Sequence, residues 1–135
     1  MPTGDAPSGF KNMGGIAVVA SSEDSIDLHG NADFIPLSLT VSEPGDYLVF
    51  ARVVIFNLDS DGQNVSARVS HGEESVIDRV DMRMPGESGT SISLQGTLRV
   101  LPNVPKQVNL RCVTFNGLAT QCSIVAVQVS DFKFS

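Results

Sequence analysis

The sequence predicts an all-β domain, an antiparallel sandwich or barrel of about eight to ten short strands. Apolar and polar residues alternate along most of the chain, which is the period of a half-buried strand. Turn-forming runs recur between these segments: SEPGD, DSDGQ, SHGEE, MPGESG, LPNVPK and FNGLA. No capped stretch repeats apolar residues at helical spacing over three turns, so helices are not expected.

The chain of 135 residues is long enough for one domain, expected over 15–135 after a flexible Gly/Pro-rich lead-in at 1–14. A net charge of −6 disfavours general binding to nucleic acid or to anionic membrane surfaces. No apolar run approaches the roughly 20 residues that span a bilayer. No signal peptide is visible, so the localisation stays open between the cytoplasm and export by another route.

Four segments are predicted to be half-buried strands, because every second residue is apolar. They cover about residues 64–70, 75–82, 91–100 and 107–115. Their inward-facing residues are expected to be Val65, Ala67 and Val69; Val76, Val80 and Met82; Ile92, Leu94, Leu98 and Val100; and Val108, Leu110 and Cys112.

Two further strands, 46–56 and 122–134, are apolar on both faces. In the first, Tyr47, Val49, Ala51, Val53 and Ile55 alternate with a second apolar set that only Arg52 interrupts. The outer face of a sandwich sheet is normally wet, so something has to cover these strands. A symmetric partner subunit is one interpretation, and residues 10–30 folding over the outer faces are the other.

The stretch IPLSLTVSEPGDYLVFARVVI resembles the Pro-x-x-Gly-x-Tyr entry of the tumour necrosis factor and complement globular-head superfamily, through Pro44, Gly45 and Tyr47. The closing CSIVAVQVSDF is similar to the last core strand of bacterial-type members. The resemblance covers about residues 34–132 and implies a ten-strand jelly roll and a compact homotrimer. One Tyr, seven Phe and no Trp are fewer aromatics than the family usually has, so aliphatic side chains would form much of the trimer seam. The expected interface residues are Tyr47, Phe50, Val54, Phe56, Val125, Val127, Val129 and Phe132.

The stretch NLDSDGQNV begins like a calcium loop, with Asp59 and Asp61 two residues apart and Gly62 directly after. An EF-hand loop needs a bidentate Glu at position 12, and that position is Ser70 here. A turn between strands is the favoured interpretation, with Asp-Gly adopting positive φ and Asp59 accepting main-chain N–H groups. Asp59 and Asp61 stay only a weak candidate for a surface metal site.

The region 73–83 is rich in charged residues. Glu73, Glu74, Asp78 and Asp81 are typical of a solvated face that keeps sheet edges from pairing. The segment RVDMRMPGESG places Arg79 and Arg83 around an acidic residue, so it is either an ordinary exit from a strand or a grip on an anionic ligand.

The two cysteines, Cys112 and Cys122, flank a turn at Asn116-Gly117. They are either free buried thiols or a disulfide pair, and their spacing matches no zinc motif.

We therefore expect a non-catalytic binding or assembly module, a compact homotrimer that presents surface loops to an unknown protein or glycan partner. The alternative is a carbohydrate-binding lectin of jelly-roll fold. A hydrolase ranks last because no nucleophile, base and oxyanion site can be assembled from the sequence. No cofactor is expected.

Overall fold

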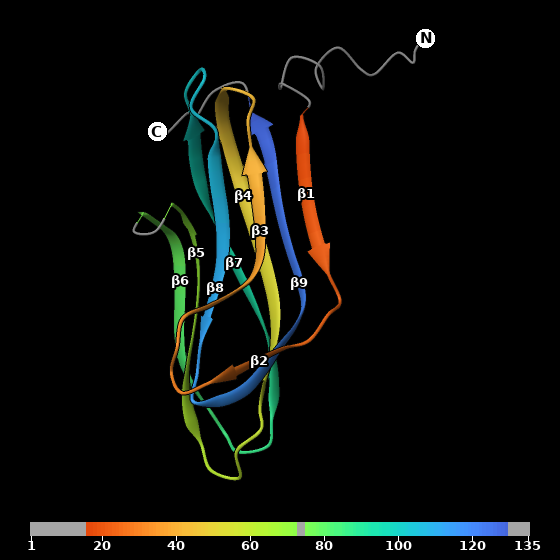
Figure 1. Cartoon of the computed structure of the whole chain (residues 1–135), viewed down its shortest axis with the longest axis vertical. Helices are drawn as coiled ribbons and strands as arrows, with labels where there is room; N and C mark the ends of the chain where they lie inside the picture. Colours follow the sequence, from red (N-terminus) through yellow and green to blue (C-terminus); the bar gives the residue numbers. More distant parts are fainter. Residues whose placement is uncertain (1–15, 73–74, 130–135) are drawn as a thin grey trace.

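The computed structural model describes residues 16–72 and 75–129, which form nine antiparallel strands and no helix (Figure 1). The strands are β1 (Ala17–Ser22), β2 (Ile26–His29), β3 (Phe34–Val41), β4 (Gly45–Asn57), β5 (Gln63–His71), β6 (Ser75–Met84), β7 (Gly89–Val100), β8 (Lys106–Val113) and β9 (Asn116–Val129).

The strands form two sheets that pack face to face (Figure 1). Sheet I has the order β1-β9-β4-β7, and β2 pairs with the beginning of β9. Sheet II has the order β3-β8-β5-β6. From β3 onward the chain changes sheet at every connection except the β5–β6 hairpin. The architecture is an all-β jelly-roll sandwich, and its nine strands confirm the predicted fold class.

The core lies between the two sheets and follows the predicted alternation. Each fully buried aliphatic side chain contributes roughly 1.5–3 kcal/mol relative to an exposed one, so this layer supplies the main driving force for folding. The predicted inward residues of 64–70, 91–100 and 107–115 are all buried: Val65, Ala67, Val69, Ile92, Leu94, Leu98, Val100, Val108, Leu110 and Cys112.

The β6 strand departs from the prediction at its beginning. Val76 was expected to face inward, but it is 50% exposed. The register shifts by a bulge between Val69 and Ser70, so Val76 pairs with Ser70 and Ile77 turns toward the core instead. Gly96 of β7 makes room for Ile77, since a Cβ at Gly96 would lie 2.4 Å from its Cγ2 atom.

The N-terminal strands extend sheet I at its edge. Residues 17–22 pair with residues 122–127 of β9, and residues 26–29 pair with residues 116–119. The interpretation that residues 10–30 fold over the doubly apolar strands is therefore wrong for the described part, because β1 and β2 lie beside β9 and leave its outer face open. The expected lead-in at 1–14 lies outside the described residues.

Candidate interaction surface

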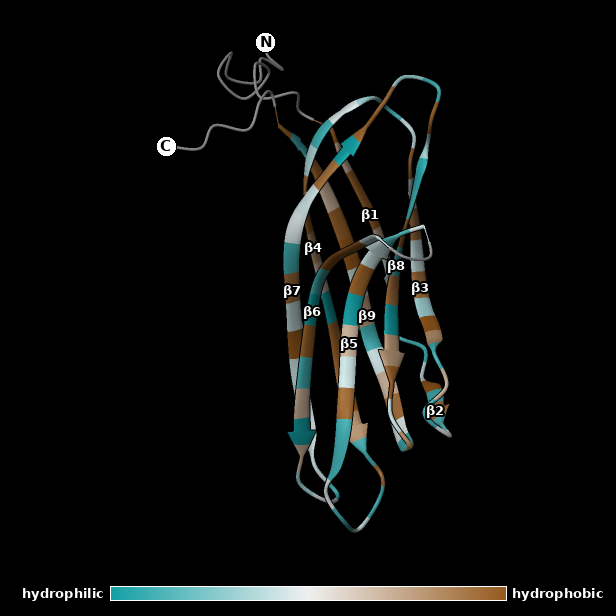
Figure 2. Ribbon diagram, turned by 90° about the vertical axis from the view of Figure 1, so that its left-hand side faces the viewer, coloured by the Kyte–Doolittle hydropathy of each residue, from teal (hydrophilic) through white to brown (hydrophobic). Residues whose placement is uncertain are grey.

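The outer face of sheet I carries a contiguous set of apolar side chains, here called the apolar band: the exposed Val19, Leu48 and Phe50 and the half-buried Val125 and Val127. The strand register aligns them, since Leu48 pairs with Val127 and Val125 lies between Phe50 and Val19. Phe50 is 43% exposed and Val19 60%. Figure 2 shows long hydrophobic stretches along β4 and β9, whereas β6 alternates between hydrophilic and hydrophobic residues.

Polar groups border the apolar band at both ends. At one end, Asp46 accepts from the Arg99 Nε atom at 2.7 Å. At the other end, the Arg52 Nε atom donates to the Ser91 Oγ atom at 3.0 Å. An apolar centre with a polar border is the usual anatomy of a protein–protein interface.

Phe50 stands between two hollows on this face. One, of about 570 Å³, is bordered by Arg52, Ser93 and Val125, and the other, of about 280 Å³, by Leu48 and Thr97. The outward positions of β7 carry small or polar side chains beside the ring, so Phe50 projects as a ridge. A ridge flanked by hollows can interlock with another surface, which a flat sheet face cannot do.

Three of the predicted interface residues lie in the apolar band: Phe50, Val125 and Val127. Val129 continues the same face and pairs with Asp46. Val54 and Phe56 lie further along β4, beyond Arg52. Phe132 lies outside the described residues. The interface prediction lacked Val19 and Leu48, although the alternation around Leu48 already placed it on this face.

Tyr47 does not belong to this surface. Its side chain is 0% exposed and lies in the core between the sheets, where its hydroxyl donates to the Glu43 carbonyl at 2.7 Å. Burial, followed by the charge of Glu43, raises the pKa of Tyr47. The alternation of β4 explains the correction, because Tyr47 shares its face with Val49 and Ala51 and the exposed face begins with Leu48.

The stretch NLDSDGQNV forms the connection between β4 and β5. Asn57, not Asp59, supplies the capping oxygen, since the Asp59 N–H donates to the Asn57 Oδ1 atom at 2.9 Å. The Asn57 amide donates to the carbonyls of Asp61 and Pro85 at 3.0 and 2.9 Å. Gly62 does not adopt positive φ, so that part of the prediction is wrong. Within residues 16–72 and 75–129, no group of three or more potential ligands that could hold a metal ion is found.

Both cysteines are buried free thiols. Cys112 is on β8 of sheet II and Cys122 on β9 of sheet I, and both face the core. Burial, followed by the charge of Cys122, raises the pKa of Cys112 to about 12. A thiol in this state has almost no thiolate at neutral pH and is unsuited to nucleophilic chemistry.

No protein-family model and no curated protein matches this chain. Among solved structures, it is similar to Eiger TNF from S. frugiperda, with a TM-score of 0.57 at 12% identity over 88% of this chain and 95% of that one. It is also similar to the structure of infectious bursal disease virus strain Gx, with a TM-score of 0.54 at 9% identity over 87% of this chain. This chain spans only 33% of that viral chain's length. At these identities the likeness establishes the fold alone, a jelly-roll sandwich. In the part of the chain that the structure describes, no helix is long and apolar enough to cross a membrane.

Proposed function

We propose that the chain is a non-catalytic assembly module of the tumour necrosis factor and complement globular-head superfamily, of bacterial type. It forms a compact homotrimer through the outer face of sheet I and presents its surface loops to a protein or glycan partner. The observation that carries this proposal is the apolar band, which β1 and β2 leave uncovered.

The energetic argument rests on the exposed apolar area. Burial of apolar surface gives roughly 25 cal/mol per Å², and the apolar band gains this only when another molecule covers it. A stable interface covers roughly 800 Å² of each partner. A partner copy would therefore cover the apolar band together with the rest of the outer face of sheet I, including Val54 and Phe56.

Self-association through the apolar band is favoured over binding to a different protein, because this face carries both a projecting side chain and hollows that can receive one. Phe50 supplies a projecting ring, and the hollows beside it supply the space that a ring from another copy would enter. The polar residues at each end, including Arg52 and Asp46, would set the orientation of the copies. The number three comes from the superfamily resemblance.

Light scattering behind a sizing column tests the proposal. We expect a mass of three chains for the unmodified protein and of one chain for Phe50→Asp and Val127→Asp, because a buried unpaired charge is costly. Phe115→Asp and Val76→Asp are matched controls. Both residues are at least half exposed, at 58% and 50%, and lie outside the apolar band, so these variants should keep the mass of the unmodified protein.

A mass of one chain for the unmodified protein would overturn the proposed assembly. A mass of two chains would keep self-association and overturn the trimer. Circular dichroism of each variant distinguishes loss of assembly from loss of folding.

A further inference from the structure

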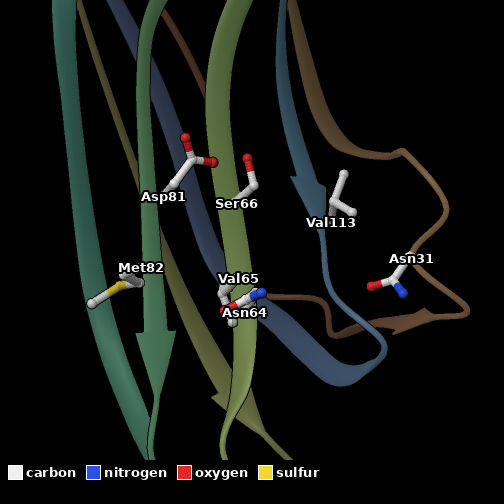
Figure 3. Close-up of a pocket in the computed structure, with 7 residues that line it drawn as sticks. All are labelled: Asn31, Asn64, Val65, Ser66, Asp81, Met82 and Val113. Atoms are coloured by element: carbon white, nitrogen blue, oxygen red, sulfur yellow. The ribbon is translucent and has the colours of Figure 1, made fainter.

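The outer face of sheet II carries a hollow of about 440 Å³. Figure 3 shows the residues that line it. This volume falls within the ~300–1,000 Å³ of small-molecule sites. Three strands and the β2–β3 connection surround the hollow. Its lining residues are Asn31, Asn64, Val65, Ser66, Asp81, Met82 and Val113.

The strand register builds the floor of the hollow. Ser66 of β5 pairs with Asp81 of β6 on one side and with Val113 of β8 on the other. Neighbouring strands lie about 4.8 Å apart, so the row from Asp81 to Val113 is roughly 10 Å wide. Asn64 precedes Ser66 by two residues and shares its outward face. The floor of the hollow thus carries three polar side chains, those of Asn64, Ser66 and Asp81.

Asn31 forms the opposite wall, on the connection that carries the chain from sheet I to sheet II (Figure 3). The main-chain N–H groups of Gly30 and Asn31 donate to carbonyls of the β8–β9 connection at 2.9 and 3.2 Å. The Asp33 carboxylate accepts from Arg68 at 2.8 Å and from Arg111 at 2.9 Å. The wall is therefore held in place before any ligand arrives, which lowers the entropic cost of binding.

The floor holds polar groups with unused hydrogen-bonding capacity. The Ser66 Oγ atom is buried and has no partner at normal hydrogen-bond geometry. It still lies close enough to Asp81 to be the main reason, ahead of Arg79, that the pKa of that carboxyl group is lowered. Asp81 is therefore ionised near neutral pH and accepts hydrogen bonds, while 58% of its side chain stays exposed.

We propose that this hollow binds a neutral saccharide. Asp81 would accept hydrogen bonds from ligand hydroxyls, and the amides of Asn31 and Asn64 would each donate and accept. Val113 would contact a C–H face of the sugar ring. An anionic ligand would meet the Asp81 carboxylate, and a cationic one would meet Arg79, which already occupies that carboxylate at 2.9 Å.

This site goes beyond the proposed assembly and does not depend on it. The hollow lies on the outer face of sheet II and the apolar band on that of sheet I. The mass of the protein therefore tests the assembly, and sugar binding tests the hollow.

Saturation-transfer NMR on the full chain tests the inference, with glucose, galactose, mannose and N-acetylglucosamine as probes and glucuronate as the anionic comparison. We expect saturable transfer from at least one neutral sugar at millimolar concentration and none from glucuronate. Asp81→Asn should lose most of the transfer, and Asp27→Asn, the same change on an exposed aspartate of β2, should retain it.

Asn31→Gly is a variant that should retain the fold. Asn31 has φ of 57° and Asn103 has φ of 62°, and glycine adopts both without strain. Asn31→Gly should abolish the transfer, and Asn103→Gly, in the β7–β8 connection, should leave it unchanged.

The proposal is overturned if none of the four neutral sugars gives saturable transfer, or if glucuronate alone does. It is also overturned if Asn31→Gly and Asn103→Gly retain the same binding. Melting curves of all variants identify any that have lost the fold, and the two glycine variants then decide the question.

Discussion

The inward faces of the two sheets have the same apolar character, whereas their outward faces differ in character. Inside, both present buried aliphatic side chains, such as Val53 in sheet I and Val69 in sheet II. Outside, sheet I presents the apolar band, whereas sheet II presents a row of three arginines: Arg68 pairs in register with Arg79 on one side and with Arg111 on the other. The inward faces determine the fold, so the outward faces are where the sheets differ in function.

The difference lies in how each outward face is satisfied. On sheet II the charges pair within the chain: Asp33 binds Arg68 and Arg111, and Asp81 binds Arg79. These charges therefore need no second molecule to be paired. On sheet I the apolar side chains gain nothing until another surface covers them. Substitutions that break these ion pairs of sheet II should therefore alter the stability of the chain, and substitutions in the apolar band of sheet I should alter its association.

The largest expected effect is on sheet II, at Asp33. Arg111 is only 9% exposed, and Asp33→Ala removes the carboxylate that pairs with its guanidinium and leaves the Ser70 hydroxyl as a neutral partner. We expect the free energy of unfolding to fall by about 2 kcal/mol, below the full cost of a broken buried pair because Asp33 is partly exposed. Urea unfolding measures the loss.

Asp24→Ala is the control for Asp33→Ala. Asp24 is exposed, and its main-chain N–H keeps its bond to the Ser22 hydroxyl, at 3.1 Å, after the substitution. The control should change the free energy of unfolding by less than about 0.5 kcal/mol. Equal effects of the two substitutions would show that the arginine row does not depend on Asp33.

A smaller effect on the chain itself is expected on sheet I, at Phe50. Assembly stabilises the folded state by mass action, so the melting temperature of the unmodified protein should rise with chain concentration. Phe50→Ser should remove this dependence. At the lowest concentration it should change the free energy of unfolding by less than about 0.5 kcal/mol, as surface substitutions usually do. A melting temperature that is independent of concentration before substitution would contradict the contrast between the faces.

The sequence was sufficient for the inward faces and for the fold class, because alternation is a local property that each strand carries in its own residues. It also marked β4 as apolar on both sides, which located Phe50. Tyr47 was misplaced because the interface prediction mixed the two faces of one strand. Val76 was misplaced because a bulge in the β5–β6 pairing reverses the alternation at that point. No residue type in this stretch indicates the bulge.

The hollow could not be read from the sequence, since it depends on contacts between distant segments. Asn31 and Asp81 are 50 positions apart in the numbering and share the hollow only because the β2–β3 connection crosses from one sheet to the other. The network around Asn57 is similar: its amide reaches Pro85, at the end of β6, and Gln63 bonds both to Asn57 and to the main chain of Asn116. Pairings of this kind follow from topology and register, which local patterns do not contain.

The smallest expected effect is again on sheet II, at His71 near the β5–β6 hairpin. Burial, followed by the charge of Lys106, lowers the pKa of His71. The unfolded chain then takes up a proton before the folded chain does. Stability is therefore complete above the unfolded pKa of about 6.5 and declines as the pH falls through the native pKa.

His71→Gln should remove this contribution. Melting temperatures measured between about pH 7 and pH 5, the range in which histidine titrates, should fall more steeply for the unmodified protein than for the variant. Carboxylates titrate in both proteins, so the difference between the two curves isolates His71. Parallel curves would mean that the folded chain accommodates the imidazolium ion of His71 as well as solvent does. Protonation near neutral pH would then leave the stability of sheet II unchanged, and the two sheets would not differ in this respect.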